Sequence, residues 1–137
     1  MPKVLIDAGP IGAYYNGGDD WHRAVTEFLT NFRGQFVTTE AVVTEVMFLL
    51  MSSVKVQNEF LLDLAKELYS VEHLLAGDFK RIAELNTKYS SVPADFAALS
   101  LIVVSERLGI TDVVSLDSDF DIYRQLRKKP FKRLFPK

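Results

Sequence analysis

Four carboxylic acids in the chain could together act on a phosphate group. These acids are Asp7, Glu45, Asp95 and Asp117, and each lies in or next to an apolar segment. Carboxylates that are held close together repel one another, so such a cluster takes up protons or binds a cation. An all-oxygen donor set, in a chain without cysteine and without clustered histidines, selects hard ions. The set therefore indicates Mg²⁺ or Mn²⁺ and hydrolysis at a phosphate, where the ion neutralises oxygens and activates water.

Two of these acids are expected at the carboxyl ends of strands. The apolar run Val4–Ile6 stops at Asp7, and the Ala8-Gly9-Pro10 segment favours a turn into a helix with the proline in its first turn. The run Val113–Ser115 is expected to end in the same way at Asp117. Because the carboxyl ends of parallel strands form the crevice where ligands bind, both side chains are expected at one edge of a sheet.

The other two acids are expected to reach this edge from helices. Thr39 is a predicted N-cap for an apolar helix over about 40–51, and this helix contains Glu45. Burying an unpaired carboxylate costs several kcal/mol, so Glu45 needs a partner or an ion. Pro93 is expected to open a helix that carries Asp95 in its first turn and continues as a nearly unbroken apolar segment.

Strands and helices alternate along the rest of the chain. Helices are expected over about 21–32, 57–69 and 78–89, with strands at 36–38, 71–73 and, as an edge strand, 131–135. The last of these helices aligns Phe79, Ile82 and Leu85 on one face. The alternation predicts an α/β fold, a three-layer domain with a short, mostly parallel central sheet flanked by helices. A single domain is expected over 1–137, with a basic C-terminal segment from about 122.

Composition limits the class of protein. The chain has 137 residues, of which 48% are hydrophobic and 25% charged, as is typical of a globular domain. The lack of cysteine excludes disulfides, thiolate zinc sites and cysteine nucleophiles. The longest apolar runs are too short to span a bilayer and the N-terminus lacks a signal-peptide layout, so a cytoplasmic protein is expected.

Each acid also has a purely structural interpretation. At a strand end before a turn, Asp7 could form an Asx-turn. Asp95 could stabilise the positive N-terminus of a helix, and Asp117 or Asp119 could cap the short helix that follows them. The sequence leaves both interpretations open.

The order and setting of the acids resemble the PIN-domain family, particularly the VapC-type toxins and their stand-alone relatives. The resemblance covers nearly the whole chain. It is carried by Val4-Leu5-Ile6-Asp7, by the helix segment 39–46, by Val92-Pro93-Ala94-Asp95 and by the segment 115–120. Ser115 replaces the more usual threonine, and Ala8 replaces a hydroxyl residue that is common after the first aspartate.

The resemblance implies a metal-dependent ribonuclease that hydrolyses RNA phosphodiester bonds. It further implies frequent homodimerisation and, in toxin members, inhibition by a cognate antitoxin. By the same resemblance, the metal-binding acids would be Asp7, Glu45, Asp95 and Asp117, with Asp119 as a fifth ligand and Ser115 as a hydroxyl that orients a carboxylate or water.

Positive charge is concentrated at the C-terminal end of the chain. All 18 acidic residues lie at or before Asp121, whereas seven of the 16 basic residues follow it. A basic segment beside an acidic body could hold nucleic-acid phosphates, and a solvated run of terminal charge is the alternative. The candidates for contact with the RNA backbone are Arg124, Arg127, Lys128, Lys129, Lys132 and Arg133.

Two other functions stay open at this stage. A catalytically silent PIN-like module would bind RNA or a protein partner with the same acids. A phosphatase or receiver-type domain would also use magnesium and an aspartate at a strand end. Receiver domains normally need a second acid near the end of the first strand and a phosphoacceptor aspartate after a middle strand, and the sequence shows neither.

Overall fold

The computed structural model describes residues 1–92 and 94–136. Its strands are β1 (Lys3–Ile6), β2 (Gln35–Thr39), β3 (Tyr69–Glu72), β4 (Asp112–Val114) and β5 (Lys132–Phe135). Its helices are α1 (Ala8–Tyr15), α2 (His22–Asn31), α3 (Glu40–Leu49), α4 (Val54–Ala65), α5 (Ala76–Lys88) and α6 (Phe96–Leu108). Two short 3₁₀ helices, η1 (Ser118–Asp121) and η2 (Leu126–Lys128), connect β4 to β5.

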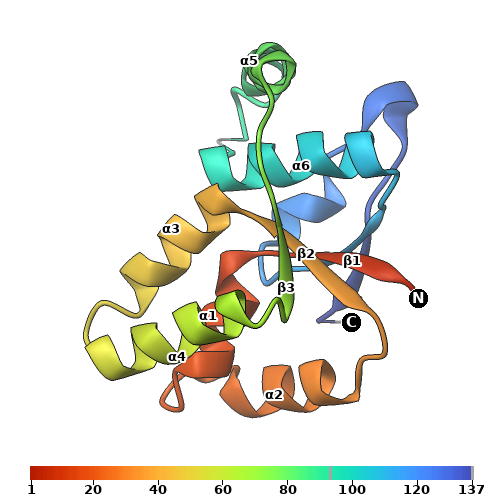
Figure 1. Ribbon diagram of the computed structural model, residues 1–137. Coiled ribbons are helices and arrows are strands. Elements are labelled where there is room, and N and C mark those ends of the chain that lie inside the picture. The colour runs from red at the N-terminus through yellow and green to blue at the C-terminus, as the bar shows by residue number, and fades with distance from the viewer. Residues whose placement is uncertain (93, 137) are drawn as a thin grey trace.

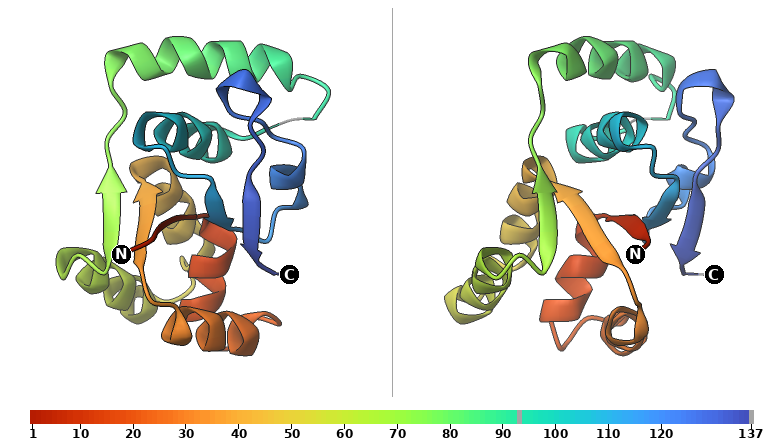
Figure 2. Two further views of the ribbon diagram at one scale, coloured as in Figure 1. Left: turned by 90° about the vertical axis from the view of Figure 1, so that its right-hand side faces the viewer. Right: turned by 45° about the vertical axis from the view of Figure 1, so that its right-hand side comes forward.

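The five strands form one sheet in the order β3-β2-β1-β4-β5, and every neighbouring pair is parallel. Helices α5 and α6 lie on one side of the sheet, and α1, α2 and α4 lie on the other (Figures 1 and 2). The predicted three-layer α/β fold is confirmed. From β1 the chain first adds strands on one side and later on the other, so the carboxyl ends of β1 and β4 flank a topological switch point.

The core explains why the central elements are so apolar. Val4, Leu5 and Ile6 of β1 are buried, as are Val113 and Val114 of β4. A parallel sheet with helices on both faces buries both faces of its strands, which therefore show runs of apolar residues rather than alternation. Helix α6 is buried from its second residue to its tenth, and ends at a glycine with φ +70°. This left-handed conformation is easily adopted by glycine, and it stops the helix.

The helix predicted over 57–69 is wrong at both ends. Helix α4 begins earlier because the Ser53 hydroxyl accepts a hydrogen bond from the Val56 backbone amide. It ends at Ala65, shortly before Glu67, whose φ of 60° cannot continue a right-handed helix. The following residues are thereby free to form β3, which confirms a strand in the region predicted as 71–73.

The start of the helix that carries the third acid differs from the prediction in one respect. Asp95 is the N-cap of α6 rather than a residue of its first turn, because its carboxylate accepts a hydrogen bond from the Ala98 amide at 2.8 Å. Pro93, which was expected to open this helix, lies outside the described residues.

Within residues 1–92 and 94–136, no helix combines the length and the hydrophobicity that crossing a bilayer requires.

Candidate active site

The ends of β1 and β4 are joined through one hydroxyl group. Asp7 is only 9% exposed, and its Oδ2 accepts a hydrogen bond of 3.1 Å from Ser115 Oγ. The same hydroxyl oxygen accepts a hydrogen bond of 3.0 Å from the Asp117 amide. Asp7 Oδ1 accepts a hydrogen bond from the Ala8 amide at 2.8 Å and so caps α1. Ser115 therefore fixes the Asp7 carboxylate relative to the backbone that carries Asp117.

A second buried hydroxyl pair positions the two helices that bring the other acids. Thr39 caps α3 through the Val42 amide, and its Oγ1 lies 2.7 Å from Ser100 Oγ on α6. The bond joins the N-terminal regions of both helices. Glu45 on α3 and Asp95 at the start of α6 are thereby held at the same edge as the strand ends.

The acids raise one another's pKa at this edge. Burial, followed by the charges of Asp7 and Asp95, raises the pKa of Glu45 to about 7. Burial, and to a lesser degree the charges of Asp95 and Asp117, raises the pKa of Asp7 to about 6, against the opposing hydrogen bonds from the Ala8 amide and the Ser115 hydroxyl. The pKa of Asp117 is also raised, first by burial and then by neighbouring carboxylates. The four predicted acids are thus brought together.

The arrangement is not a preformed metal cage. Among the residues that the structure describes, no three Asp, Glu or His side chains converge closely enough to hold an ion. Asp7, Asp95 and Asp117 each direct one oxygen to a backbone amide at the start of a helix. The remaining carboxylate oxygens are hard donors under mutual repulsion. They fit a divalent cation, whose charge would favour drawing them together.

Two further groups border these acids. Asp119 donates its backbone amide to Asp117 Oδ1 at 2.9 Å, and its charge contributes to the raised pKa of Asp117 after that of burial. Tyr123 is fully buried, and its pKa is raised by burial first and then by the charges of four aspartates, Asp117, Asp119, Asp95 and Asp7. In the sequence this phenol is marked by nothing except its spacing of three residues from Phe120, which is also buried.

Of the six basic residues predicted to contact RNA, Arg133 has hydrogen bonds and an ion pair close to the acids. Arg133 reaches the acid edge, where it donates to the Ser115 carbonyl at 3.2 Å and pairs with Asp121 at 3.0 Å. Its positive charge opposes the rise in the pKa of Asp117 that burial causes. Arg133 is therefore a predicted RNA contact that lies beside the acids.

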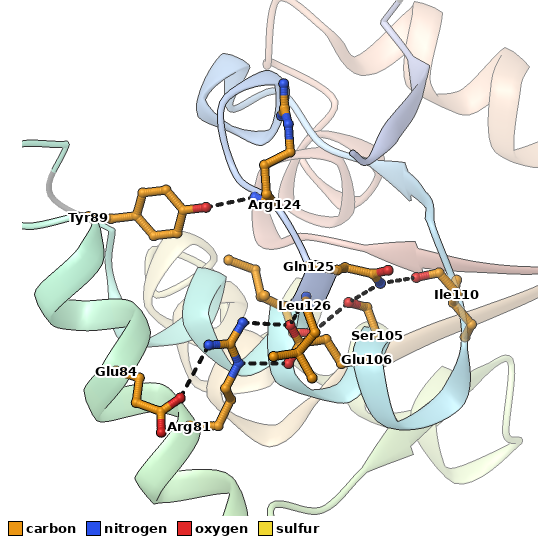
Figure 3. Close-up of polar contacts among 10 residues, drawn as sticks. Arg81, Glu84, Tyr89, Ser105, Glu106, Ile110, Arg124, Gln125 and Leu126 are labelled. Atoms are coloured by element: carbon orange, nitrogen blue, oxygen red, sulfur yellow. Dashed lines mark hydrogen bonds and ion pairs between the residues drawn. The ribbon is translucent and has the colours of Figure 1, made fainter. Parts of the chain in front are cut away.

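The loop that follows η1 is anchored by a polar network at the far end of α6 (Figure 3). Glu106 accepts hydrogen bonds from Arg81 at 3.0 and 2.8 Å, and from the Leu126 amide at 2.8 Å. The buried Gln125 side chain donates to Ser105 Oγ at 2.8 Å. Two side chains of α6 thus hold the basic segment in place, Glu106 through the Leu126 backbone and Ser105 through the Gln125 side chain.

This anchoring separates the tip of the basic segment from the acids. Glu106 follows Asp95 by eleven residues of helix, which corresponds to about 16 Å at 1.5 Å per residue. The tip residues Arg127 and Lys128 are exposed and have φ values of 62° and 61°. Such conformations are unfavourable for residues with a Cβ, and the surrounding bonds maintain them.

The fold and the site define a class of protein: an α/β domain with a carboxylate-lined ligand edge at the switch point of a parallel sheet. Within that class, the chain belongs to the PIN-domain family, which it matches over residues 4–126.

Similar proteins with known names or structures cover nearly the same length. Ribonuclease VapC26 of Mycobacterium tuberculosis is 25% identical over 116 residues, which are 83% of this chain and 86% of that protein. The crystal structure of Mycobacterium tuberculosis VapC20, a sarcin-ricin loop cleaving toxin, matches with a TM-score of 0.81 at 19% identity, over 93% of this chain and 99% of that one. VapBC2 from Rickettsia felis, bound to a promoter DNA fragment, matches with a TM-score of 0.65 at 14% identity, over 96% and 98% of the two chains. At these identities, the two structures show the fold.

Proposed function

We propose that this chain is a metal-dependent ribonuclease that hydrolyses RNA phosphodiester bonds. The observation that carries the proposal is the meeting of four acids from β1, α3, α6 and the end of β4, where burial and mutual repulsion raise the pKa of Glu45 to about 7. Carboxylates that repel one another, one of them buried and two partly buried, destabilise the metal-free protein, and a bound cation would relieve the repulsion. The similarity to ribonuclease VapC26 supports RNA as the substrate.

The roles proposed for the residues follow from their positions. When bound, Mg²⁺ or Mn²⁺ supplies charge neutralisation at the phosphate and an activated water. The Ser115 hydroxyl orients Asp7 through the 3.1 Å hydrogen bond. The residues that would hold the ion are Asp7, Glu45, Asp95 and Asp117, with Asp119 as a further candidate.

Cleavage of a mixed pool of labelled tRNA, rRNA fragments and unstructured RNA tests this function. We expect cleavage with Mg²⁺ or Mn²⁺, none with EDTA, and a loss of at least ~100-fold in Asp95→Asn. The asparagine can still cap α6 through its side-chain oxygen, so circular dichroism should show an intact fold.

Two outcomes would contradict the assignment. Cleavage that persists in Asp95→Asn at the wild-type rate would remove this residue from the site and point to a contaminating nuclease. Binding of RNA without cleavage, for every metal and substrate, would favour the catalytically silent PIN-like module.

A toxin role with a cognate antitoxin, and a homodimer, are part of the same proposal. The VapBC2 complex is a precedent for an antitoxin. A homodimer is supported by an exposed apolar surface on the α3–α4 hairpin. Several of its large side chains are between 49% and 68% exposed: Phe48, Leu49, Met51, Val54 and Leu62. Exposed apolar surface of this kind is characteristic of protein interfaces.

We further propose that the basic segment contacts the RNA backbone. Replacing its tip residues Arg127, Lys128 and Lys129 together by Gln should weaken binding to all RNAs. It should also lower the slope of log affinity against log salt by about 2, since each phosphate contact in a single strand contributes about 0.7. A filter-binding titration at several salt concentrations measures this slope. The control replaces three exposed lysines elsewhere, Lys55, Lys66 and Lys80, and should leave the slope nearly unchanged. Equal slopes in the two variants would show that the tip residues do not contact RNA.

A further inference from the structure

A cavity of about 670 Å³ opens directly beside the four acids. It is an open cavity lined by α3, by the end of β3, by the first turns of α5 and by the N-terminal end of α6. Two of the candidate metal ligands form part of its wall, so the cavity and the acid edge are one continuous surface. Its lining includes Glu45, Asp95, Glu72, His73, Phe79 and Phe96.

Two aromatic rings in this wall are exposed to solvent. Phe79 of α5 is 53% exposed, and Phe96, the residue after Asp95, is 49% exposed. Their ring centroids are 6.3 Å apart and their planes differ by 18°. The two rings are therefore nearly parallel, and a flat ligand that stacks on either would take nearly the same orientation. The periodicity of α5 aligns Phe79 with Ile82 and Leu85, which are buried, but at this end of the helix about half of the Phe79 side chain stays exposed.

The wall of the cavity is held in place around these rings. Arg107 donates to the His73 carbonyl at 2.8 Å and pairs with Asp78 at 3.2 Å and with Glu72 at 3.6 Å. His73 also pairs with Glu40 at the rim. The segment between β3 and α5 is thus fixed at both ends, and a ligand would meet a preformed surface.

The charge of the lining selects what can enter. Among the described residues that line the cavity, the ionisable groups are four carboxylates and one histidine, and there is neither lysine nor arginine. A phosphate would be repelled by such a wall. A nucleobase carries no charge and presents a flat π-face. Its amino and imino N–H groups can also donate hydrogen bonds to carboxylates.

We propose that this cavity is a base-binding subsite, in which an unpaired nucleobase next to the cleaved phosphate stacks on Phe79 and Phe96. The inference rests on the proposed ribonuclease function, because RNA is the ligand whose phosphate must reach the adjoining acids. In this proposal Phe79 and Phe96 select substrates, because only a base that is unpaired and outside an RNA double helix can stack on them. Stacking on an aromatic ring tolerates all four bases, so the subsite favours unpaired over paired RNA rather than one sequence.

Fluorescence and affinity measurements on a non-cleavable RNA test the subsite. The probe is a 2′-O-methyl oligonucleotide containing 2-aminopurine, whose fluorescence falls when the base stacks. In the presence of Mg²⁺ we expect wild type to quench it, Phe79→Tyr to keep both quenching and affinity, and Phe79→Leu to weaken binding roughly tenfold with loss of quenching. Leucine keeps apolar volume at a half-exposed position, so thermal unfolding should show the variant folded.

The outcomes separate the subsite from the nuclease function. Quenching and affinity unchanged in both Phe79→Leu and Phe96→Leu would overturn the subsite, even with cleavage intact, and would assign the rings to a different occupant such as a protein side chain. Quenching that depends on the two rings, in a protein that cleaves no RNA, would support the subsite and refute the nuclease. Wild type that binds no RNA would overturn both.

Discussion

Asp7→Asn is expected to abolish RNA cleavage while stabilising the metal-free protein at neutral pH. Cleavage should fall at least ~100-fold, because the variant lacks a charge that the cation requires. The gain in stability follows from the raised pKa of the buried carboxyl, which moves from its usual 3.8 to about 6 in the folded protein. The charged form is therefore disfavoured by folding.

The pH dependence of this effect has a definite sign. Between pH 4 and 6 the folded state holds a proton on Asp7 that the unfolded state has lost, so the free energy of unfolding decreases as pH rises through this window. At pH 7 the variant should be more stable by on the order of 2 kcal/mol. Below about pH 4 the difference should vanish. Urea titrations at pH 3.5 and 7, in EDTA, measure both values, and a variant that is less stable than wild type at pH 7 would refute the argument.

Glu106→Ala is expected to cause a large loss of stability without touching the acids. The Glu106 side chain is 9% exposed and that of Arg81 is 20% exposed. Removing the carboxylate leaves the Nε and Nη2 groups of Arg81 and the Leu126 amide without their acceptor. Breaking an ion pair of this kind, together with a backbone hydrogen bond, should cost about 2–3 kcal/mol.

The neighbouring Glu84→Gln provides the matched comparison. Glu84 also pairs with Arg81, at 3.3 Å, but its side chain is 55% exposed. Its replacement should cost less than about 0.5 kcal/mol. Hydrogen exchange at the Leu126 amide should accelerate in Glu106→Ala alone, since this amide donates to Glu106. Equal losses of stability in the two variants would show that the network does not anchor the basic segment.

The sequence predicts the centre of the sheet well because β1 and β4 are buried on both faces. The runs at β1 and β4 are short, apolar and followed by an acid, which indicates both the strand and its functional end. The C-terminal end of α4 could not be predicted in this way, because Leu61, Leu64 and Leu68 keep helical spacing although the helix ends at Ala65. A single residue, Glu67 with a left-handed backbone, ends the helix there, and its identity gives no sign of that conformation.

The site, too, has some residues that the sequence predicts and others that it does not. The four acids could be found because each borders an apolar element, and the structure brings them together. Phe79 and Phe96 could not, since an aromatic residue at helical spacing indicates core packing, and only the tertiary structure leaves both uncovered. The basic residues are close in sequence, but the hydrogen bonds of Gln125 and Leu126 to α6 place their tip away from the acids.

The long-range pairing of β1 with β4 determines when the acid edge can exist during synthesis. Leu5 pairs with Val113, more than a hundred residues later in the chain, and Asp7 is fixed by Ser115 only after that pairing. Non-local parallel pairing is among the slower steps in folding. A nascent chain that has emerged only as far as α6 contains three of the acids but cannot align them. Any activity of this edge must therefore wait until β4 has left the ribosome, long after β1 has been synthesised.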